Sequence, residues 1–169
     1  MLIAAGLPDR AEINTLYSLP DGRPVAAEIG ALAPPLTLMS VHGEQISTDS
    51  LTERIVILNY WATWCAPCQI EMPALQELTE RYPAALTVLG INAGEAPDAI
   101  RAWREHFGLT FPLLLDPDGA TARDYRLRGQ PTTVIVAPGG IIHKIIYGPA
   151  DIGSLEQAIV GLLPIQDER

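Results

Sequence analysis

The chain has 169 residues, of which 48% are hydrophobic and 18% are charged. This composition can build one substantial apolar core, so it excludes a disordered chain and favours a single domain. The net charge of −9, with Lys144 as the only lysine, argues against nucleic acid as a partner, because phosphate binding requires clustered Lys and Arg.

Residues 1–30 are interpreted as an irregular extension, and residues 31–169 are expected to form the domain. The extension is polar, rich in Ala, Pro and Gly, and contains a turn signal at Asp21-Gly22. Its opening letters, MLIAAGLPDRAE, lack the basic and apolar regions of a signal peptide. No apolar run reaches the roughly 18–20 residues that span a bilayer. Two localisations stay open: a cytoplasmic protein, or an exported one whose signal or membrane anchor is absent from this sequence.

The first strands of the domain are predicted from turn and burial signals. Residues 36–48 favour a β-hairpin around His42-Gly43. Residues 54–61, RIVILNYW, form a nearly continuous β-branched and aromatic run, which is typical of a strand buried on both faces.

A helix is predicted from Ala66 to Tyr82. Pro67 falls in its first turn, where a missing N–H is harmless, and Pro73 inside it should produce a kink. We expect the buried face to be the one that carries Ile70, Ala74, Leu75, Leu78 and Tyr82.

The rest of the chain continues this alternation and ends in a hairpin. Alternating strands and helices imply parallel strands joined by crossover helices, whereas a hairpin implies antiparallel ones. The predicted fold class is therefore α/β, with a mixed central sheet flanked by helices. The expected elements are a strand at 85–92, a helix at 96–108, a strand at 111–116, a turn and short helix at 117–127, two strands within 131–148 joined at Pro138-Gly139-Gly140, and a helix at 151–163.

Both cysteines lie in one stretch, NYWATWCAPCQIEMP, at residues 59–73. A structural clip between Cys65 and Cys68 would restrain little of the unfolded chain, and a zinc site would need two further ligands. A redox couple fits better. Cys65 falls at the predicted helix N-terminus, where unpaired N–H groups favour a thiolate, and Cys68, one turn on and more buried, can resolve a mixed disulfide.

WCAPC after a hydrophobic strand, together with GQPTTVIV later in the chain, resembles the thioredoxin fold. The resemblance implies that Pro131 is a cis-proline facing the redox pair. There it would block a metal from bridging the two sulfurs and present the backbone of Gln130 to an incoming peptide. The candidate substrate contacts are Trp64, Ala66, Pro67, Gln130 and Thr132.

The finer resemblance, over residues 30–163, is to the TlpA/ResA-like branch, which serves thiol–disulfide exchange and cytochrome c maturation. It is carried by the hairpin, by the stretch at 59–73 and by DPDG at 116–119. It implies a three-layer thioredoxin-like fold with an N-terminal β-hairpin and a central βα insertion. Ordinary thioredoxins carry a buried aspartate where this chain has Asn59, and Glu71 matches a glutamate that this branch keeps near its cysteines.

The resemblance implies an extracytoplasmic reductase, a thiol–disulfide oxidoreductase that exchanges disulfides with partner proteins through the WCAPC dithiol. It implies no dissociable cofactor and no metal.

 

In that reading, Cys65 attacks, Cys68 resolves the mixed disulfide, and Glu71 accepts the proton of Cys68. The expected partners are protein dithiols and disulfides, such as apocytochrome c or copper-site assembly proteins, together with a membrane-borne thiol that donates electrons. The chain is expected to act as a monomer, without nucleic acid.

Three other functions are weighed against this one. Copper-handling relatives on this fold pair two cysteines with a distant histidine, which His143 would supply, but they use a CxxxC spacing. Peroxidatic cysteines follow a PxxxTxxC pattern, whereas Thr63 stands only two residues before Cys65 and the preceding residues, LNYWATW, contain no proline. In a peptide-binding module the disulfide would be inert.

Several residues also have purely structural readings. Glu71 can be a solvated helix residue, and Asn59 a hydrogen-bonded core residue. Trp61 and Trp64 can serve packing or partner contact. The remaining residues are expected to be structural only: Trp103 in the core, and His42, His106 and His143 at the surface.

Overall fold

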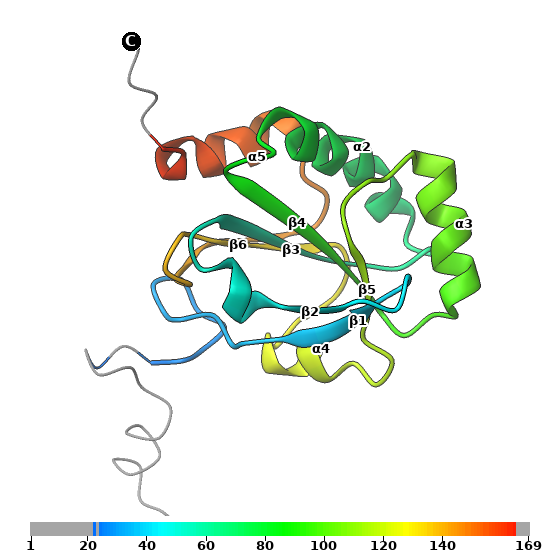
Figure 1. The fold of residues 1–169 in the computed structure, drawn as a ribbon, viewed down its shortest axis with the longest axis horizontal. Coiled ribbons are helices and arrows are strands. Elements are labelled where there is room, and N and C mark those ends of the chain that lie inside the picture. Colours follow the sequence, from blue (N-terminus) through cyan, green and yellow to red (C-terminus); the bar gives the residue numbers. More distant parts are fainter. Residues whose placement is uncertain (1–21, 23, 165–169) are drawn as a thin grey trace, which may run out of the picture.

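The computed structural model describes residue 22 and residues 24–164, and it forms a mixed seven-stranded sheet with helices on both faces (Figure 1). The strand order is β2-β1-β5-β4-β3-β6-β7. The strands are β1 (Thr37–Ser40), β2 (Gln45–Ser47), β3 (Ile55–Trp61), β4 (Leu86–Asn92), β5 (Leu113–Leu115), β6 (Thr132–Val136) and β7 (Ile142–Tyr147). The helices are η1 (Thr48–Leu51), α2 (Ala66–Arg81), α3 (Pro97–Phe107), α4 (Ala120–Asp124), α5 (Ile152–Ile159) and η2 (Val160–Leu162).

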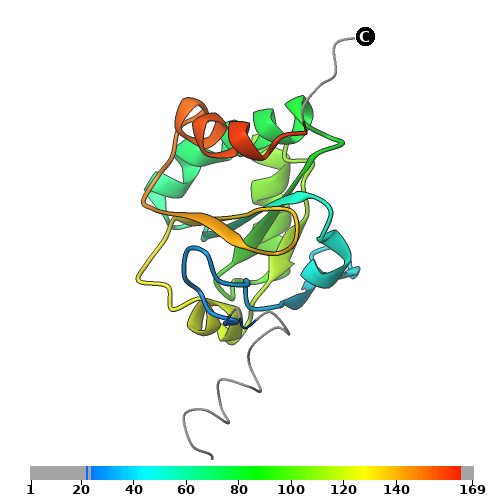
Figure 2. The same cartoon turned by 90° about the vertical axis from the view of Figure 1, so that its left-hand side faces the viewer.

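The predicted α/β class and the three-layer arrangement are confirmed. Helices α2 and α5 lie on one face of the sheet and α4 on the other, as the two perpendicular views show (Figures 1 and 2). The predicted hairpin is β1–β2, and β5 with α4 supplies the central βα segment. The short 3-10 helix η1 was not expected from the sequence.

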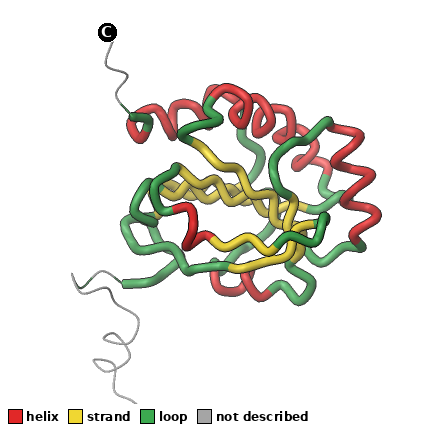
Figure 3. Tube along the Cα trace, viewed as in Figure 1, coloured by secondary structure: helices red, strands yellow, loops and turns green. Residues whose placement is uncertain are grey.

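Strand β3 is buried along its whole length, as its apolar run predicts. Because side chains alternate across a strand, Ile57 and Trp61 pack on the α2 side, and Leu58 and Tyr60 pack on the α4 side. The strand therefore contributes to two separate apolar cores. It lies inside the sheet between β4 and β6, and the strands of this sheet are yellow in Figure 3.

The register of β3 brings two distant loops to one edge of the sheet. Strand β3 runs parallel to β4 and antiparallel to β6, with Tyr60 opposite Thr132. The end of β3 therefore lies beside the start of β6. The loop that carries Cys65 and the loop that carries Pro131 meet at this edge, although about half of the domain separates them in sequence.

Helix α2 buries the predicted residues Ala74, Leu75 and Leu78, with Tyr82 partly buried against the core, but the predicted stripe is wrong in its first two turns. Ile70 is wrong as a core residue, because its side chain is 70% exposed. The buried residues of the first two turns are instead Cys68, Glu71 and Met72, followed by Leu75 and Leu78 as expected. The helix begins at Ala66 as predicted, and the apolar pattern failed in its first turns because a glutamate, Glu71, occupies a core position. The helix continues through Pro73 without a break.

Residues 24–33, most of them inside the predicted extension, are bonded to the β6–β7 hairpin. Leu32 forms isolated bridges with Val25 and Ile141. The N–H of Gly30 donates to the carbonyl oxygen of Ile142 at 2.8 Å. The predicted boundary at residue 30 stays a prediction, because residues 1–21 lie outside the described part.

We predict that Gly90→Ala destabilises the fold by about 1–3 kcal/mol. A Cβ at Gly90 would lie 2.8 Å from Leu113 Cδ2 and 3.1 Å from Trp61 Nε1. Because the core is close-packed, these side chains cannot move away without disturbing their neighbours. Urea unfolding measures the change. Gly161→Ala, where the added Cβ meets open space, is the matched control and should change stability by less than about 0.5 kcal/mol. Equal stability of the two variants would contradict the prediction.

Candidate active site

The two cysteines form a disulfide at the N-terminus of α2, with their Cα atoms 5.3 Å apart. Cys65 is the N-cap residue, and its Sγ accepts a hydrogen bond from the backbone N–H of Cys68 at 3.3 Å. Pro67 lies in the first turn, as predicted. Cys65 keeps 4% of its surface exposed and Cys68 none. Since the helix dipole and a backbone N–H both point at the sulfur of Cys65, this position favours a thiolate once the bond is reduced.

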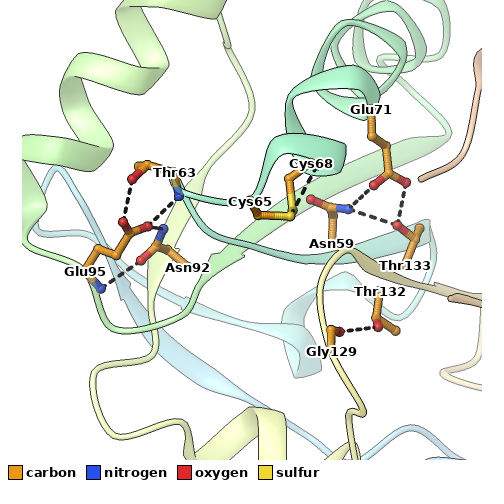
Figure 4. Close-up of a disulfide and its surroundings, with 10 residues drawn as sticks. All are labelled: Asn59, Thr63, Cys65, Cys68, Glu71, Asn92, Glu95, Gly129, Thr132 and Thr133. Carbon is orange, nitrogen blue, oxygen red and sulfur yellow. Dashed lines mark hydrogen bonds between the residues drawn. A yellow bond between two sulfur atoms is a disulfide. The ribbon is translucent and has the colours of Figure 1, made fainter. Parts of the chain in front are cut away.

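A buried polar cluster lies beside the disulfide (Figure 4). Glu71 is fully buried and accepts hydrogen bonds from Thr133 Oγ1 at 2.8 Å and from Asn59 Nδ2 at 3.0 Å. Asn59 Nδ2 also donates to Thr133 Oγ1 at 2.9 Å. The cluster joins β3, α2 and β6. The solvated reading of Glu71 is therefore wrong, while Asn59 is a hydrogen-bonded core residue, as its structural reading expected.

Burial raises the pKa of Glu71 above its usual range, because an apolar environment opposes ionisation. The hydrogen bonds from Thr133, from Asn59 and from the backbone at Ala150 act in the opposite direction but do not outweigh the burial. A carboxyl group with a raised pKa close to a redox cysteine can take up or release a proton nearer neutral pH than an exposed glutamate can.

A second carboxylate holds the loop that leads to Cys65, and no pattern in the sequence singles it out. Glu95 accepts hydrogen bonds from the N–H of Thr63 at 2.7 Å and from Thr63 Oγ1 at 2.5 Å. Asn92 Nδ2 donates to it at 2.8 Å. Burial opposes its ionisation, but the hydrogen bonds from Thr63 and Asn92 prevail and lower the pKa of Glu95. Only the fold brings the β4–α3 loop to this place.

The Gln130-Pro131 peptide bond is cis, as the resemblance implied. The carbonyl oxygen of Pro131 accepts from the N–H of Gly148 at 2.9 Å, and Thr132 Oγ1 donates to the carbonyl oxygen of Gly129 at 2.7 Å. These bonds fix the loop against the end of β7.

The five candidate substrate contacts differ in exposure. Trp64 is 71% exposed, Ala66 is exposed, and Pro67 and Gln130 are half-buried. Thr132 is buried. Their role in partner contact stays a prediction.

The other aromatic residues and the histidines have the structural roles expected of them. Trp61 is fully buried and stacks on Trp103, with ring centroids 5.4 Å apart. His42, His106 and His143 are all exposed. Within residues 24–164, no group of three or more His, Cys, Asp or Glu side chains is placed to hold a metal ion. In the same range, no helix has the length and apolar character needed to cross a membrane.

Three comparisons place this geometry among known proteins. The AhpC/TSA family profile matches residues 29–145. The chain is 35% identical over 147 residues to the thioredoxin-like protein YneN of Bacillus subtilis, covering 85% of this chain and 86% of that protein. It is 30% identical over 151 residues to the thiol-disulfide oxidoreductase ResA of Geobacillus kaustophilus, covering 89% and 87%. A thioredoxin-family thiol:disulfide interchange protein of Chlorobium tepidum shares the fold, with a TM-score of 0.74, 22% identity and coverage of 81% and 99%.

We predict that Glu71→Gln stabilises the protein relative to wild type at neutral pH, and that this gain disappears in acid. A carboxyl group whose pKa is raised on folding contributes stability below its unfolded pKa, and that contribution is lost as the pH rises through the folded pKa. Urea unfolding at about pH 4 and pH 8 measures the difference between the two proteins. Glu77→Gln, an exposed position of the same helix, is the control and should show little change with pH. A gain for Glu71→Gln that is independent of pH would contradict the prediction.

Proposed function

This chain belongs to the AhpC/TSA family and is a thiol–disulfide oxidoreductase, and on that premise we propose that it reduces disulfides of partner proteins through the Cys65–Cys68 dithiol. The observation that carries the proposal is the place of Cys65 at the N-cap of α2, with a backbone N–H directed at its sulfur.

The reaction is a two-step exchange. The Cys65 thiolate attacks one sulfur of the partner disulfide, forming a mixed disulfide and releasing the other partner sulfur as a thiol. Cys68 then loses its proton and attacks Cys65, which closes the Cys65–Cys68 disulfide and releases the second partner thiol. The partner disulfide gains two electrons and two protons, and the dithiol of this chain loses them.

Glu71 is proposed to accept the proton of Cys68 in the second step. It lies three residues after Cys68 on α2 and is buried in the same layer. Because its pKa is raised, Glu71 has a proton affinity closer to that of a thiol than an exposed carboxylate has. This favours proton transfer from Cys68 to Glu71.

The partner is proposed to bind across the edge where the two loops meet. Trp64 offers an exposed aromatic surface next to Cys65. Gln130 is half-buried, and no backbone hydrogen bond joins it to any other residue in the described range. Its main chain can therefore pair with an extended peptide. Ala66, Pro67 and Thr132 complete the proposed contact surface.

The compartment and the partners follow from the resemblance to the TlpA/ResA-like branch. We place the protein outside the cytoplasm, where disulfides form readily and a reductase needs electrons from a membrane-borne thiol. The proposed substrates are apocytochrome c or copper-site assembly proteins, and the chain is proposed to act as a monomer without a dissociable cofactor.

Cys68→Ala is predicted to accumulate mixed disulfides on Cys65, because nothing can resolve them. The reduced variant is mixed with a protein disulfide such as insulin, alkylated, and separated on a non-reducing gel. Cys65→Ala is the matched control and should trap far less, since the remaining thiol is fully buried. If Cys68→Ala captures no partner, and the wild-type disulfide is not reduced by dithiothreitol, the disulfide is inert and the proposal fails.

Glu71→Gln is predicted to slow the resolution step by about 100-fold near neutral pH, the usual size of a general-base contribution. The wild-type rate should rise as Glu71 ionises, whereas the variant rate should rise only near the free-thiol pKa of about 8.5. Stopped-flow measurement of mixed-disulfide decay against pH gives both profiles, with Glu77→Gln as control. Superimposable profiles for wild type and Glu71→Gln would exclude this role.

A further inference from the structure

The carboxamide of Asn59 lies between the redox pair and Glu71 (Figure 4). Its nitrogen is directed toward Glu71 and Thr133, and its oxygen lies on the side of the disulfide. Asn59 is fully buried, and its Oδ1 has no hydrogen-bond partner among the residues that the structure describes. The proton-transfer role proposed for Glu71 makes no use of this oxygen.

The orientation of the amide is fixed by its neighbours. Glu71 Oε2 and Thr133 Oγ1 both accept from Asn59 Nδ2, and the hydroxyl of Thr133 already donates to Glu71 Oε1. If the amide were reversed, its oxygen would face a carboxylate, which can only accept while ionised. Oδ1 is therefore held toward the cysteines.

A buried carbonyl oxygen without a donor is unfavourable, and nearly all such groups in proteins find a partner. The disulfide has no hydrogen to offer. Reduction creates an S–H donor on Cys68, which is fully buried beside this amide and projects from α2 on the same side as Glu71.

We propose that Asn59 Oδ1 accepts the thiol hydrogen of Cys68 in the reduced protein. Reduction breaks the Cys65–Cys68 bond with two electrons and two protons from a dithiol donor, and one of the protons becomes this S–H. The unpaired oxygen disfavours the oxidised form and is satisfied in the reduced form, so Asn59 raises the reduction potential.

The same contact separates the roles of the two sulfurs. A carbonyl oxygen can pair with a thiol but not with a thiolate, so it holds Cys68 protonated while Cys65, at the helix N-terminus, attacks. During resolution the S–H bond of Cys68 breaks, its hydrogen bond to Asn59 Oδ1 is lost, and the proton passes to Glu71. This role of Asn59 rests on the proposed exchange cycle, and it names a residue that sets the equilibrium between the dithiol and the disulfide.

The test is the reduction potential of Asn59→Leu, which replaces the amide by an apolar group of similar size. Equilibration with dithiothreitol should show an equilibrium constant for reduction about tenfold lower than in wild type, which corresponds to a potential ~30 mV more negative. Thr79→Val is the matched control. It removes a hydroxyl of α2 that donates to the carbonyl oxygen of Leu75, outside the cluster of Asn59, Glu71 and Thr133, so its constant should stay within about twofold of wild type.

A second measurement leaves Asn59 intact. In Cys65→Ser the only thiol of the chain is that of Cys68. Its infrared S–H stretch should lie below that of a free cysteine thiol, because hydrogen bonding weakens the S–H bond. An unshifted stretch, or a wild-type potential in Asn59→Leu, would overturn the inference while leaving the exchange cycle standing. A disulfide that dithiothreitol cannot reduce would instead overturn the proposed function.

Discussion

The burial of one carboxyl group, that of Glu71, is the constraint around which this site is organised. A buried carboxyl group is tolerated only when it is hydrogen-bonded. Glu71 accepts from Asn59 on β3 and from Thr133 on β6, two residues that lie opposite each other in the paired strands. The helix that carries Glu71 also carries Cys68, three residues earlier. The hydrogen bonds that satisfy the carboxyl group therefore fix the position of α2, and with it Cys68, against strands β3 and β6.

The second half of the site depends on the edge of the sheet. Because β6 runs antiparallel to β3, the loop with Cys65 begins where the loop with cis-Pro131 ends. Glu95 reaches the same edge from the end of β4 and secures the backbone at Thr63. Three loops from separate parts of the chain thus surround the disulfide, and each is fixed by hydrogen bonds rather than by the disulfide itself.

The two buried oxygens near the cysteines have complementary roles in the proposed cycle. Glu71 offers a group whose pKa is raised by burial and which can take a proton. Asn59 Oδ1 offers an acceptor that can hold a thiol hydrogen but cannot remove it. An aspartate at position 59, as in ordinary thioredoxins, would combine both properties in one residue and place a second acidic group beside Glu71.

The order of the elements, the class of sheet and the identity of the redox pair could be predicted from the residues alone. These follow from local patterns: the apolar run of β3, the N-cap position of Cys65, and the motif around Pro131. Local patterns failed on α2, where Ile70 looked like core and is exposed, while Glu71 looked polar and is buried. They gave no sign of Glu95. These points became visible only in the fold, because a polar side chain can be buried only where distant strands supply its hydrogen-bond partners. Strand register, and not the neighbouring residues in the sequence, sets which partners it meets.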